Sequence, residues 1–311
     1  MPEPAASPAR PAPPAPPAPL RSIGQALDEA VTRLARAEIR DPRREAMALW
    51  AAVAGGGMKP GAVWLDRARE PAPDVARRFE QALERRLDGA PFAYAVGRTA
   101  FRSLELKLDT RALIPRPETE GLVDLVLRET GMRDVGCGMR GMVADVGTGC
   151  GCIALSLAVE GHFERVIAVE RSPGAADLAR ENVALVRPPV PVEVHEGDLL
   201  APLAGERCRA IVSNPPYLTD AEYLHLDRSV TRFEPRDALV SGPDGLAATR
   251  ALLAGAPGVL EPGGLLALEV DERRAERVAR LARELAWSRV HVYDDLFGRP
   301  RYVLAILEED A

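Results

Sequence analysis

The segment Asn214-Pro215-Pro216-Tyr217 carries the most specific chemistry in this sequence. An amide or aromatic amino group is a poor nucleophile because its lone pair is delocalised, and two hydrogen-bond acceptors on its hydrogens can hold it for reaction. The side-chain oxygen of Asn214 and the main-chain carbonyl of Pro215 can be those acceptors. The prolines stiffen the segment, so positioning costs little entropy, and Tyr217 offers a flat face. We therefore assign Asn214, Pro215, Pro216 and Tyr217 as catalytic and substrate-binding residues.

A glycine-rich loop lies upstream, in the run Asp145-Val146-Gly147-Thr148-Gly149-Cys150-Gly151-Cys152. It follows a predicted strand and opens a predicted helix, where glycines let the backbone approach a ligand closely and adopt positive φ. A dinucleotide fold would share this outline, but the Lys-Ser/Thr pair of a phosphate-binding loop is absent from the run. The loop predicts a cofactor site made by Gly147, Thr148, Gly149, Cys150 and Gly151.

Three acidic residues follow predicted strands and can address different parts of a cofactor. Asp145 ends the first strand, where a carboxylate could face a cationic ligand. Glu170 ends the second strand and can accept both hydroxyls of a ribose, a feature common to nicotinamide and S-adenosylmethionine sites. Asp198 follows the third strand and could receive an adenine amino group with Leu199 against the ring. The alternative for Asp198 is a simple turn residue after Gly197.

Arg116 and Glu118 lie on a stiff segment at residues 114–120, which we call the strap: Ile114-Pro115-Arg116-Pro117-Glu118-Thr119-Glu120. Two charged groups beside the expected cleft, on a segment stiffened by prolines, predict a gate or a substrate clamp. A solvated linker between domains is the alternative.

Alternating strands and helices are predicted from Met142 onward. The expected strands lie at residues 142–146, 166–169, 192–195, 210–212 and 265–270, with helices at 153–159 and 175–186 among them. This alternation implies an α/β fold with a parallel sheet and helices on both faces. The loops that follow the strands then meet at one edge of the sheet, where ligands bind.

The N-terminal part divides into segments of different composition. Residues 1–19 are almost entirely Pro and Ala, which predicts a disordered tail. Residues 20–89 show helical periodicity, with Ser22 and Asp74 as expected N-caps, and predict a helical domain for substrate recognition or support. Residues 90–115 alternate with period two and predict a hairpin linker, which leaves 116–311 as the catalytic domain.

Charge and composition exclude several classes of protein. The 311-residue chain has a formal net charge of -6 and therefore lacks a general basic surface for nucleic acid. No apolar run approaches the roughly 20 residues that span a bilayer, and the N-terminus lacks a signal-peptide core, so a cytoplasmic location is expected. The four cysteines and four histidines show neither a disulfide framework nor metal-ligand spacing, so no metal is expected.

The sequence resembles the HemK family of release factor glutamine N5-methyltransferases from about residue 20 to the end. Asn-Pro-Pro-Tyr alone is shared with DNA adenine methyltransferases, whereas the strap and an Arg-Phe-Glu-Pro segment are much more specific. The residues that carry the resemblance are Gly97 to Phe101, the strap, the glycine loop, Asn214 to Tyr217, Arg232 to Pro235 with Ala238-Leu239, and Asp295 to Arg301.

The resemblance implies a class I S-adenosylmethionine-dependent methyltransferase fold, which is Rossmann-like with a mostly parallel seven-stranded sheet, and a helical N-terminal domain. It implies methylation of the glutamine in the Gly-Gly-Gln loop of bacterial peptide chain release factors, by a monomer. The acidic net charge and the small helical domain separately predict no direct nucleic-acid contact. Gly147 to Gly151, Glu170 and Leu199 would line the cofactor. Asn214 would touch cofactor and glutamine, and Pro215 to Tyr217 would bind the glutamine amide.

One stretch departs from the family pattern. Where the family often has Glu-x-Gly followed by Gln, this chain has Glu269-Val270-Asp271-Glu272-Arg273-Arg274. We expect this stretch to lie outside the core site.

Two alternatives remain open on the sequence alone. A methyltransferase could act on another planar nitrogen, such as a ribosomal-protein glutamine or an adenine in nucleic acid, although adenine would normally require a basic face and a way to extrude the base. A cofactor-binding protein could also serve translation as a scaffold without catalysis. Binding alone, however, does not require the Asn-Pro-Pro-Tyr arrangement.

Overall fold

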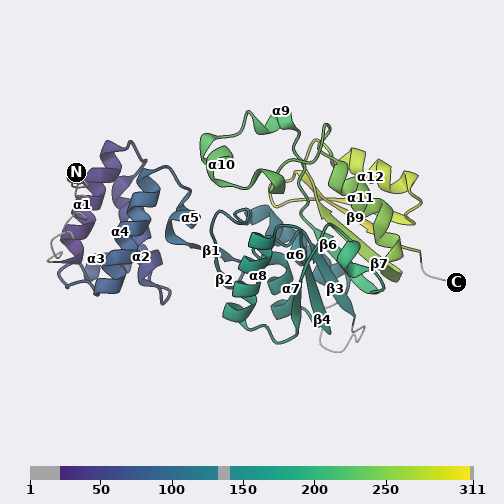
Figure 1. Cartoon of the computed structure of the whole chain (residues 1–311), viewed down its shortest axis with the longest axis horizontal. Helices are drawn as coiled ribbons and strands as arrows, with labels where there is room; N and C mark the ends of the chain where they lie inside the picture. Colours follow the sequence, from purple (N-terminus) through teal and green to yellow (C-terminus); the bar gives the residue numbers. More distant parts are fainter. Residues whose placement is uncertain (1–21, 132–140, 309–311) are drawn as a thin grey trace, which may run out of the picture. The chain divides into compact units, whose positions relative to one another are not determined.

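The computed structural model describes residues 22–131 and 141–308. The predicted tail at residues 1–19 lies outside these ranges. The described chain divides between Leu87 and Asp88 into two compact units, each with its own helices (Figure 1).

In residues 22–87 four helices are described: α1 (Ile23–Arg36), α2 (Pro42–Ala54), α3 (Pro60–Leu65) and α4 (Pro73–Leu87). The Ser22 hydroxyl accepts a hydrogen bond from the Gln25 N–H at 3.2 Å, which confirms Ser22 as the N-cap of α1. The prediction for Asp74 was wrong. The helix begins at Pro73, whose fixed φ suits the first helical position, and Asp74 lies inside the first turn.

The second unit is built on a mostly parallel sheet of seven strands in the described residues. Strands β3 to β7 run parallel, and β9 and β8 join antiparallel at one side, which confirms the predicted fold class. In spatial order the strands are β5 (Val192–Glu196), β4 (Arg165–Glu170), β3 (Met142–Val146), β6 (Cys208–Ser213), β7 (Leu260–Glu269), β9 (Pro300–Ile306) and β8 (Arg289–Asp294).

Both faces of this sheet are covered by helices, so its central strands are mostly apolar. Val143 packs into the core beneath α6 (Pro117–Glu129), α7 (Cys152–Glu160) and α8 (Pro173–Val186). Its neighbours Met142 and Ala144 pack into the opposite core beneath α11 (Ala247–Gly255) and α12 (Ala275–Glu284). The alternation of successive side chains between two cores fixes the register of the sheet.

The fifth parallel strand is longer than predicted. β7 begins at Leu260, which pairs with Cys208, and the next pair is Leu265 with Ala210. The residues between Leu260 and Leu265, including Pro262-Gly263-Gly264, form an irregularity inside the strand rather than a turn before it, because a bulge accommodates unpaired residues without ending the ladder.

A short hairpin precedes the sheet and packs against the same core as α6 to α8. Strands β1 (Arg98–Phe101) and β2 (Leu104–Lys107) pair antiparallel after the short helix α5 (Phe92–Val96). Phe101 and Leu106 are 1% and 0% exposed, so their period-two pattern marks a buried face. The hairpin therefore belongs to the second unit.

An excursion between β6 and α11 contains the short helices α9 (Asp220–Tyr223) and α10 (Arg228–Phe233) and the single-turn helix η2 (Arg236–Ala238) (Figure 1). Two further 3₁₀ turns, η1 (Ala201–Leu203) and η3 (Ala256–Gly258), complete the described elements. Among the described residues, no helix combines the length and apolar character needed to cross a membrane.

Candidate active site

The glycine loop joins the end of β3 to the start of α7 and depends on glycine at three positions. Gly147, Gly149 and Gly151 have φ values of 76°, 57° and 86°, a region that side chains rarely adopt. The N–H groups of Gly147 and Thr148 both donate to the Val169 carbonyl, at 2.8 and 3.0 Å, which anchors the loop to β4. Gly147 is exposed, and no atom lies within 4 Å of the place a Cβ would take, so a ligand can approach its backbone.

Asp145 stands behind this loop and organises it. Its Oδ2 accepts hydrogen bonds from the Thr148 hydroxyl at 2.6 Å and from the Ala154 N–H at 3.0 Å. Burial raises the pKa of Asp145 to about 7, against the two hydrogen bonds, which lower it. The prediction that this carboxylate faces a cationic ligand does not match the geometry. The side chain is 0% exposed and is directed into the protein.

Glu170 ends β4 and lies directly against the glycine loop. Its Oε2 accepts from the Gly149 N–H and its Oε1 from the Ser172 N–H, both at 2.9 Å. Each carboxylate oxygen has two lone pairs, so each can still accept one further hydrogen. The arrangement is compatible with the predicted capture of two ribose hydroxyls.

Asp198 and Leu199 follow β5 at the same edge of the sheet. The Gly197 N–H donates to the Glu170 carbonyl at 2.9 Å, which places this turn beside the end of β4. The Asp198 side chain is 65% exposed and lies 3.9 Å from Arg171, so it is open to a ligand. Leu199 adopts a φ of 47° and is half-buried. Their roles against adenine stay predictions.

The Asn-Pro-Pro-Tyr segment leaves β6 beside the glycine loop. The Ser213 hydroxyl donates to the Val146 carbonyl at 2.6 Å and so joins the ends of β6 and β3. The N–H groups of Tyr217 and Leu218 donate to the Leu239 carbonyl at 3.1 and 2.8 Å. The motif is therefore held at its start by the sheet and at its end by the excursion after β6.

A glycine that sequence reasoning overlooked packs against the end of the motif. A Cβ at Gly245 would lie 2.3 Å from the Tyr217 carbonyl oxygen, and the φ of Gly245 is 73°. Because only glycine permits this approach, Gly245 supports the path of the motif. Burial raises the pKa of Tyr217, so its side chain stays a neutral phenol.

The strap is anchored at two points. The Arg116 guanidinium donates to Glu234 Oε1 at 2.7 Å, and the side chain of Glu234 is only 1% exposed. The Glu118 carbonyl accepts from the Tyr302 hydroxyl at 2.6 Å. These contacts bond the middle of the strap to the sheet unit at two neighbouring positions, and a gate stays a prediction. A fixed substrate clamp stays a prediction.

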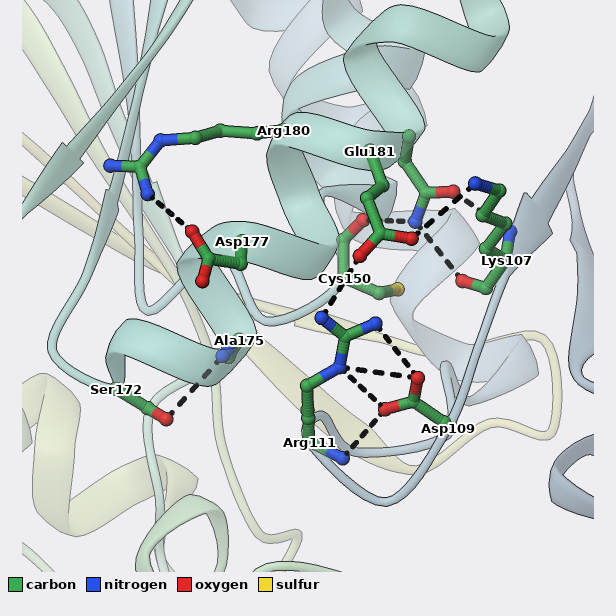
Figure 2. Close-up of polar contacts among 10 residues, drawn as sticks. Lys107, Asp109, Arg111, Cys150, Ser172, Ala175, Asp177, Arg180 and Glu181 are labelled. Carbon is green, nitrogen blue, oxygen red and sulfur yellow. Dashed lines mark hydrogen bonds and ion pairs between the residues drawn. The ribbon is translucent and has the colours of Figure 1, made fainter.

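The segment that leads to the strap is fixed to α8. Arg111 pairs with Asp109 at 2.8 Å and with Glu181 of α8 at 3.0 Å, and Figure 2 shows the three side chains pointing toward one another. The Asn182 amide, also on α8, donates to the carbonyls of Lys107 and Cys150 at 3.0 and 2.8 Å. One helix thus holds both the hairpin and the glycine loop.

Two buried residues beside Asn214 were missed. The Asn214 Nδ2 donates to the Thr119 hydroxyl at 3.3 Å, and Thr119 lowers the pKa of the adjacent Glu269 carboxyl. Although this stretch was expected from the sequence to lie outside the core site, Glu269 ends β7 and is 2% exposed. The position of Glu269 in the sequence could have indicated this, because an acid that ends an apolar strand of a parallel sheet reaches the ligand-binding edge.

The cysteines of the glycine loop are ordinary buried thiols. Cys150 and Cys152 are free, and the Cys150 neighbour and burial both raise the pKa of Cys152. In residues 22–131 and 141–308, no cluster of three or more potential metal ligands occurs.

The fold and these positions define a class of protein. A glycine loop after β3, an acid at the end of β4 and Asn-Pro-Pro-Tyr after β6, all at the carboxyl edge of a mostly parallel sheet, define a class I methyltransferase. Two family models match the chain, and the second of them agrees with this class. The PrmC N-terminal domain family matches residues 25–97, and the methyltransferase small domain family matches residues 124–231.

Relatives narrow the class to a family. A release factor glutamine methyltransferase of Moorella thermoacetica is 41% identical over 292 residues, which cover 93% of this chain and 100% of the relative. One of Deinococcus radiodurans is 40% identical and covers 90% and 96%. The chain belongs to the release factor glutamine methyltransferase family.

A solved structure carries the same description. The release-factor-specific protein-(glutamine-N5) methyltransferase of Alicyclobacillus acidocaldarius is 30% identical, covers 63% of this chain and 94% of its own, and has a TM-score of 0.38.

Proposed function

We propose that this protein transfers a methyl group from S-adenosylmethionine to the side-chain amide nitrogen, N5, of the glutamine in the Gly-Gly-Gln motif of peptide chain release factors. The observation that carries the proposal is the 2.6 Å hydrogen bond from Ser213 to the Val146 carbonyl. It joins the ends of β6 and β3, so Asn214 stands next to the glycine loop. A donor of methyl groups and a planar nitrogen can therefore meet at one edge.

The residues around the glycine loop fit S-adenosylmethionine. The open backbone at Gly147 admits a close approach, and Glu170 keeps acceptor capacity for two ribose hydroxyls. Asp198 and Leu199 lie at the same edge for the adenine. When bound there, S-adenosylmethionine supplies an electrophilic methyl group.

The residues after β6 would hold the glutamine amide. Because Asn214 uses its Nδ2 on Thr119, its Oδ1 is directed elsewhere and can accept one amide hydrogen. The Pro215 carbonyl can accept the other, and Pro216 and Tyr217 provide a stiff, flat wall. Both hydrogens are then fixed, so the nitrogen lone pair is aimed at its target, and a proton leaves after nitrogen becomes cationic. No base of unusual strength is needed.

The nature of the partner follows from this reaction. The substrate is a protein, a release factor, and we propose that residues 22–87 take part in its recognition. We further propose that the enzyme acts as a monomer in the cytoplasm, without direct nucleic-acid contact. The net charge of -6 supports the last point.

The test is methyl transfer to a purified release factor, followed by intact-protein mass measurement. We expect a gain of one methyl group with the natural release factor and none when the motif glutamine is replaced by alanine. Asn214→Ala serves as the catalytic control on the enzyme side.

The same methyl-transfer reaction, run with ribosomal proteins and with DNA as substrates, tests whether a ribosomal-protein glutamine or an adenine is methylated instead. Methylation of either one, without methylation of the release factor, would contradict the proposal. Binding of S-adenosylmethionine, measured separately by calorimetry, shows whether a negative result comes from the substrate or from an enzyme that lacks its cofactor.

A further inference from the structure

Asn214 can accept a hydrogen bond from the substrate only if the oxygen of its side-chain amide, and not the nitrogen, points toward the substrate. A carboxamide presents an oxygen at one end and an NH₂ group at the other, and the two ends have almost the same shape. With Oδ1 toward the substrate, Asn214 accepts an amide hydrogen. With Nδ2 toward the substrate, two donors would face each other. Something in the protein must select the first orientation.

The selecting contact is made by Thr119, in the first turn of α6. Its hydroxyl lies 3.3 Å from Asn214 Nδ2, and the residue is 2% exposed, so water does not compete for this contact. A hydroxyl can donate or accept, however. Thr119 alone would tolerate either orientation of the Asn214 amide.

Glu269 removes this ambiguity. The Thr119 hydroxyl adjoins the Glu269 carboxyl and lowers its pKa, and an ionised carboxylate can only accept the hydrogen of a neighbouring hydroxyl. The single hydroxyl hydrogen of Thr119 is therefore committed to Glu269. Only the lone pairs of Thr119 remain for Asn214, so Nδ2 must point to Thr119 and Oδ1 must point away.

We propose that Glu269 and Thr119 are positioning residues, which fix the Asn214 amide with its oxygen toward the substrate. The proposal rests on the proposed function, because it assigns how Asn214 is prepared for a planar nitrogen substrate. Glu269 and Thr119 touch neither substrate nor cofactor and act through Asn214. Their contribution belongs to turnover and not to cofactor binding.

Protonation of Glu269 would undo the selection, since a carboxylic acid can donate to Thr119 and free the threonine hydrogen for Asn214 Oδ1. Burial raises the pKa of Glu269 to about 7, while Thr119 and Arg301 lower it. The polar groups facing Glu269 are Arg116, Glu118 and Thr119 from the strap and α6, Tyr217 after β6, and Arg301 and Tyr302 on β9. Turnover should therefore fall as pH drops through about 7.

Thr119→Val and Thr119→Ser form a matched pair for the test. Valine keeps the shape and removes the hydroxyl, whereas serine keeps the hydroxyl. Loss of a hydrogen bond tied to a charged group predicts a kcat about ten- to hundredfold lower for Thr119→Val, with S-adenosylmethionine affinity unchanged. Thr119→Ser should restore most of kcat. Equal kcat in wild type and Thr119→Val would overturn the proposal.

Glu269→Gln gives an independent kinetic readout. Glutamine can donate to Thr119 through its NH₂ group, as the protonated acid can, so kcat should be low. Because glutamine cannot ionise, the fall of kcat near pH 7 should disappear from the pH profile. An acid limb that persists unchanged in Glu269→Gln would assign it to another group and contradict the proposal.

The amide orientation can be observed without any substrate, because the chain has only two asparagines, Asn182 and Asn214. Selective ¹⁵N-asparagine labelling then yields two side-chain NH₂ signals by NMR. Asn182 donates to two backbone carbonyls and reports whether the fold is intact. We expect the Asn214 signals to shift in Thr119→Val and to return in Thr119→Ser, with those of Asn182 fixed throughout.

These NMR signals distinguish a failure of the positioning role from a failure of the proposed function. Unmoved Asn214 signals in Thr119→Val would overturn the positioning role whatever the substrate proves to be. If the Thr119 variants show the expected NMR response but the wild-type enzyme methylates no release factor, the proposed function is contradicted and the positioning role stays supported.

Discussion

The two halves of the active site are each built around a buried carboxyl group, and the two groups act on different parts of the protein. Asp145 stands behind the glycine loop and Glu269 behind Asn214, and burial raises the pKa of each to about 7. Each leaves one oxygen, Asp145 Oδ1 and Glu269 Oε2, without a hydrogen-bond partner among the described residues.

The difference lies in what each carboxyl holds. Asp145 accepts from a main-chain N–H and from a threonine of the same loop, so it fixes backbone shape. Glu269 acts on Thr119, which contacts the side chain of Asn214. The cofactor half is therefore organised through the main chain and the nucleophile half through side chains. Changes in the first should affect stability and cofactor binding, and changes in the second should affect turnover.

Asn214→Ala should have the largest effect and should be confined to turnover. Removal of one preorganised hydrogen-bonding group at a reacting centre costs about 10²- to 10³-fold in kcat. The glycine loop is untouched, so S-adenosylmethionine affinity should stay within about twofold. Steady-state kinetics and calorimetry measure the two quantities, and equal losses in both would remove Asn214 from its role as the amide acceptor.

Arg116→Met should destabilise the nucleophile half without touching the glycine loop. The change leaves the Glu234 carboxylate buried and unpaired, and Arg116 itself is about a third exposed, so we expect a loss of about 2 to 3 kcal/mol in the free energy of unfolding. Urea denaturation measures it.

The matched double variant Arg116→Met with Glu234→Gln tests the cause of that loss. It removes the unpaired charge as well, so it should recover part of the stability. A double variant that is less stable than Arg116→Met alone would show that the strap is held by something other than this ion pair.

Asp145→Asn should change how stability depends on pH. The pKa of Asp145 is raised from 3.8 to about 7, so the folded protein binds this proton more tightly than the unfolded chain. The protonated Asp145 carboxyl makes its full contribution to the free energy of unfolding below about pH 4. This contribution is lost as pH rises through about 7. Asparagine does not ionise, so the variant should gain about 2 kcal/mol relative to wild type between pH 5 and pH 8.

Urea denaturation of both proteins at the two pH values provides this comparison. Glu269 titrates in wild type and variant alike, so its contribution cancels in the difference. A stability difference between the proteins that is the same at pH 5 and pH 8 would show that Asp145 does not titrate in this range.

Glu84→Gln should have the smallest effect and serves as the control outside both halves. Glu84 forms an ion pair with Arg33 in the helical unit, and its side chain is 62% exposed. Exposed pairs contribute about 0 to 1 kcal/mol, and the effect weakens in salt. Thermal denaturation should show little change, and kcat on a small glutamine peptide should stay the same.

The sequence was sufficient for the parts of the site that local pattern encodes. The glycine loop, Glu170 and Asn214 each follow an apolar strand, and parallel strands bring their carboxyl ends to one edge. The supporting contacts were not predictable in this way. Asn214 meets Thr119 across 95 residues of sequence, and Arg116 meets Glu234 across 118, so no local spacing relates them.

The role of Asp145 was misjudged for a related reason. Its position at a strand end indicated the ligand-binding edge, but side chains alternate between the two faces of a strand. Whether a carboxyl at that point meets a ligand or the following helix depends on the loop that covers it. Here the loop folds back, and Thr148 and Ala154 enclose the carboxyl group.

The most direct test of the central claim is to locate the transferred methyl group at atomic level. A release factor is incubated with the enzyme and S-adenosylmethionine, and the Gly-Gly-Gln peptide is analysed by fragment-ion mass spectrometry. The account predicts one methyl group on the side-chain nitrogen of the glutamine, and none when Asn214→Ala replaces the wild type. A methyl group on any other residue, or equal methylation by Asn214→Ala, would contradict it.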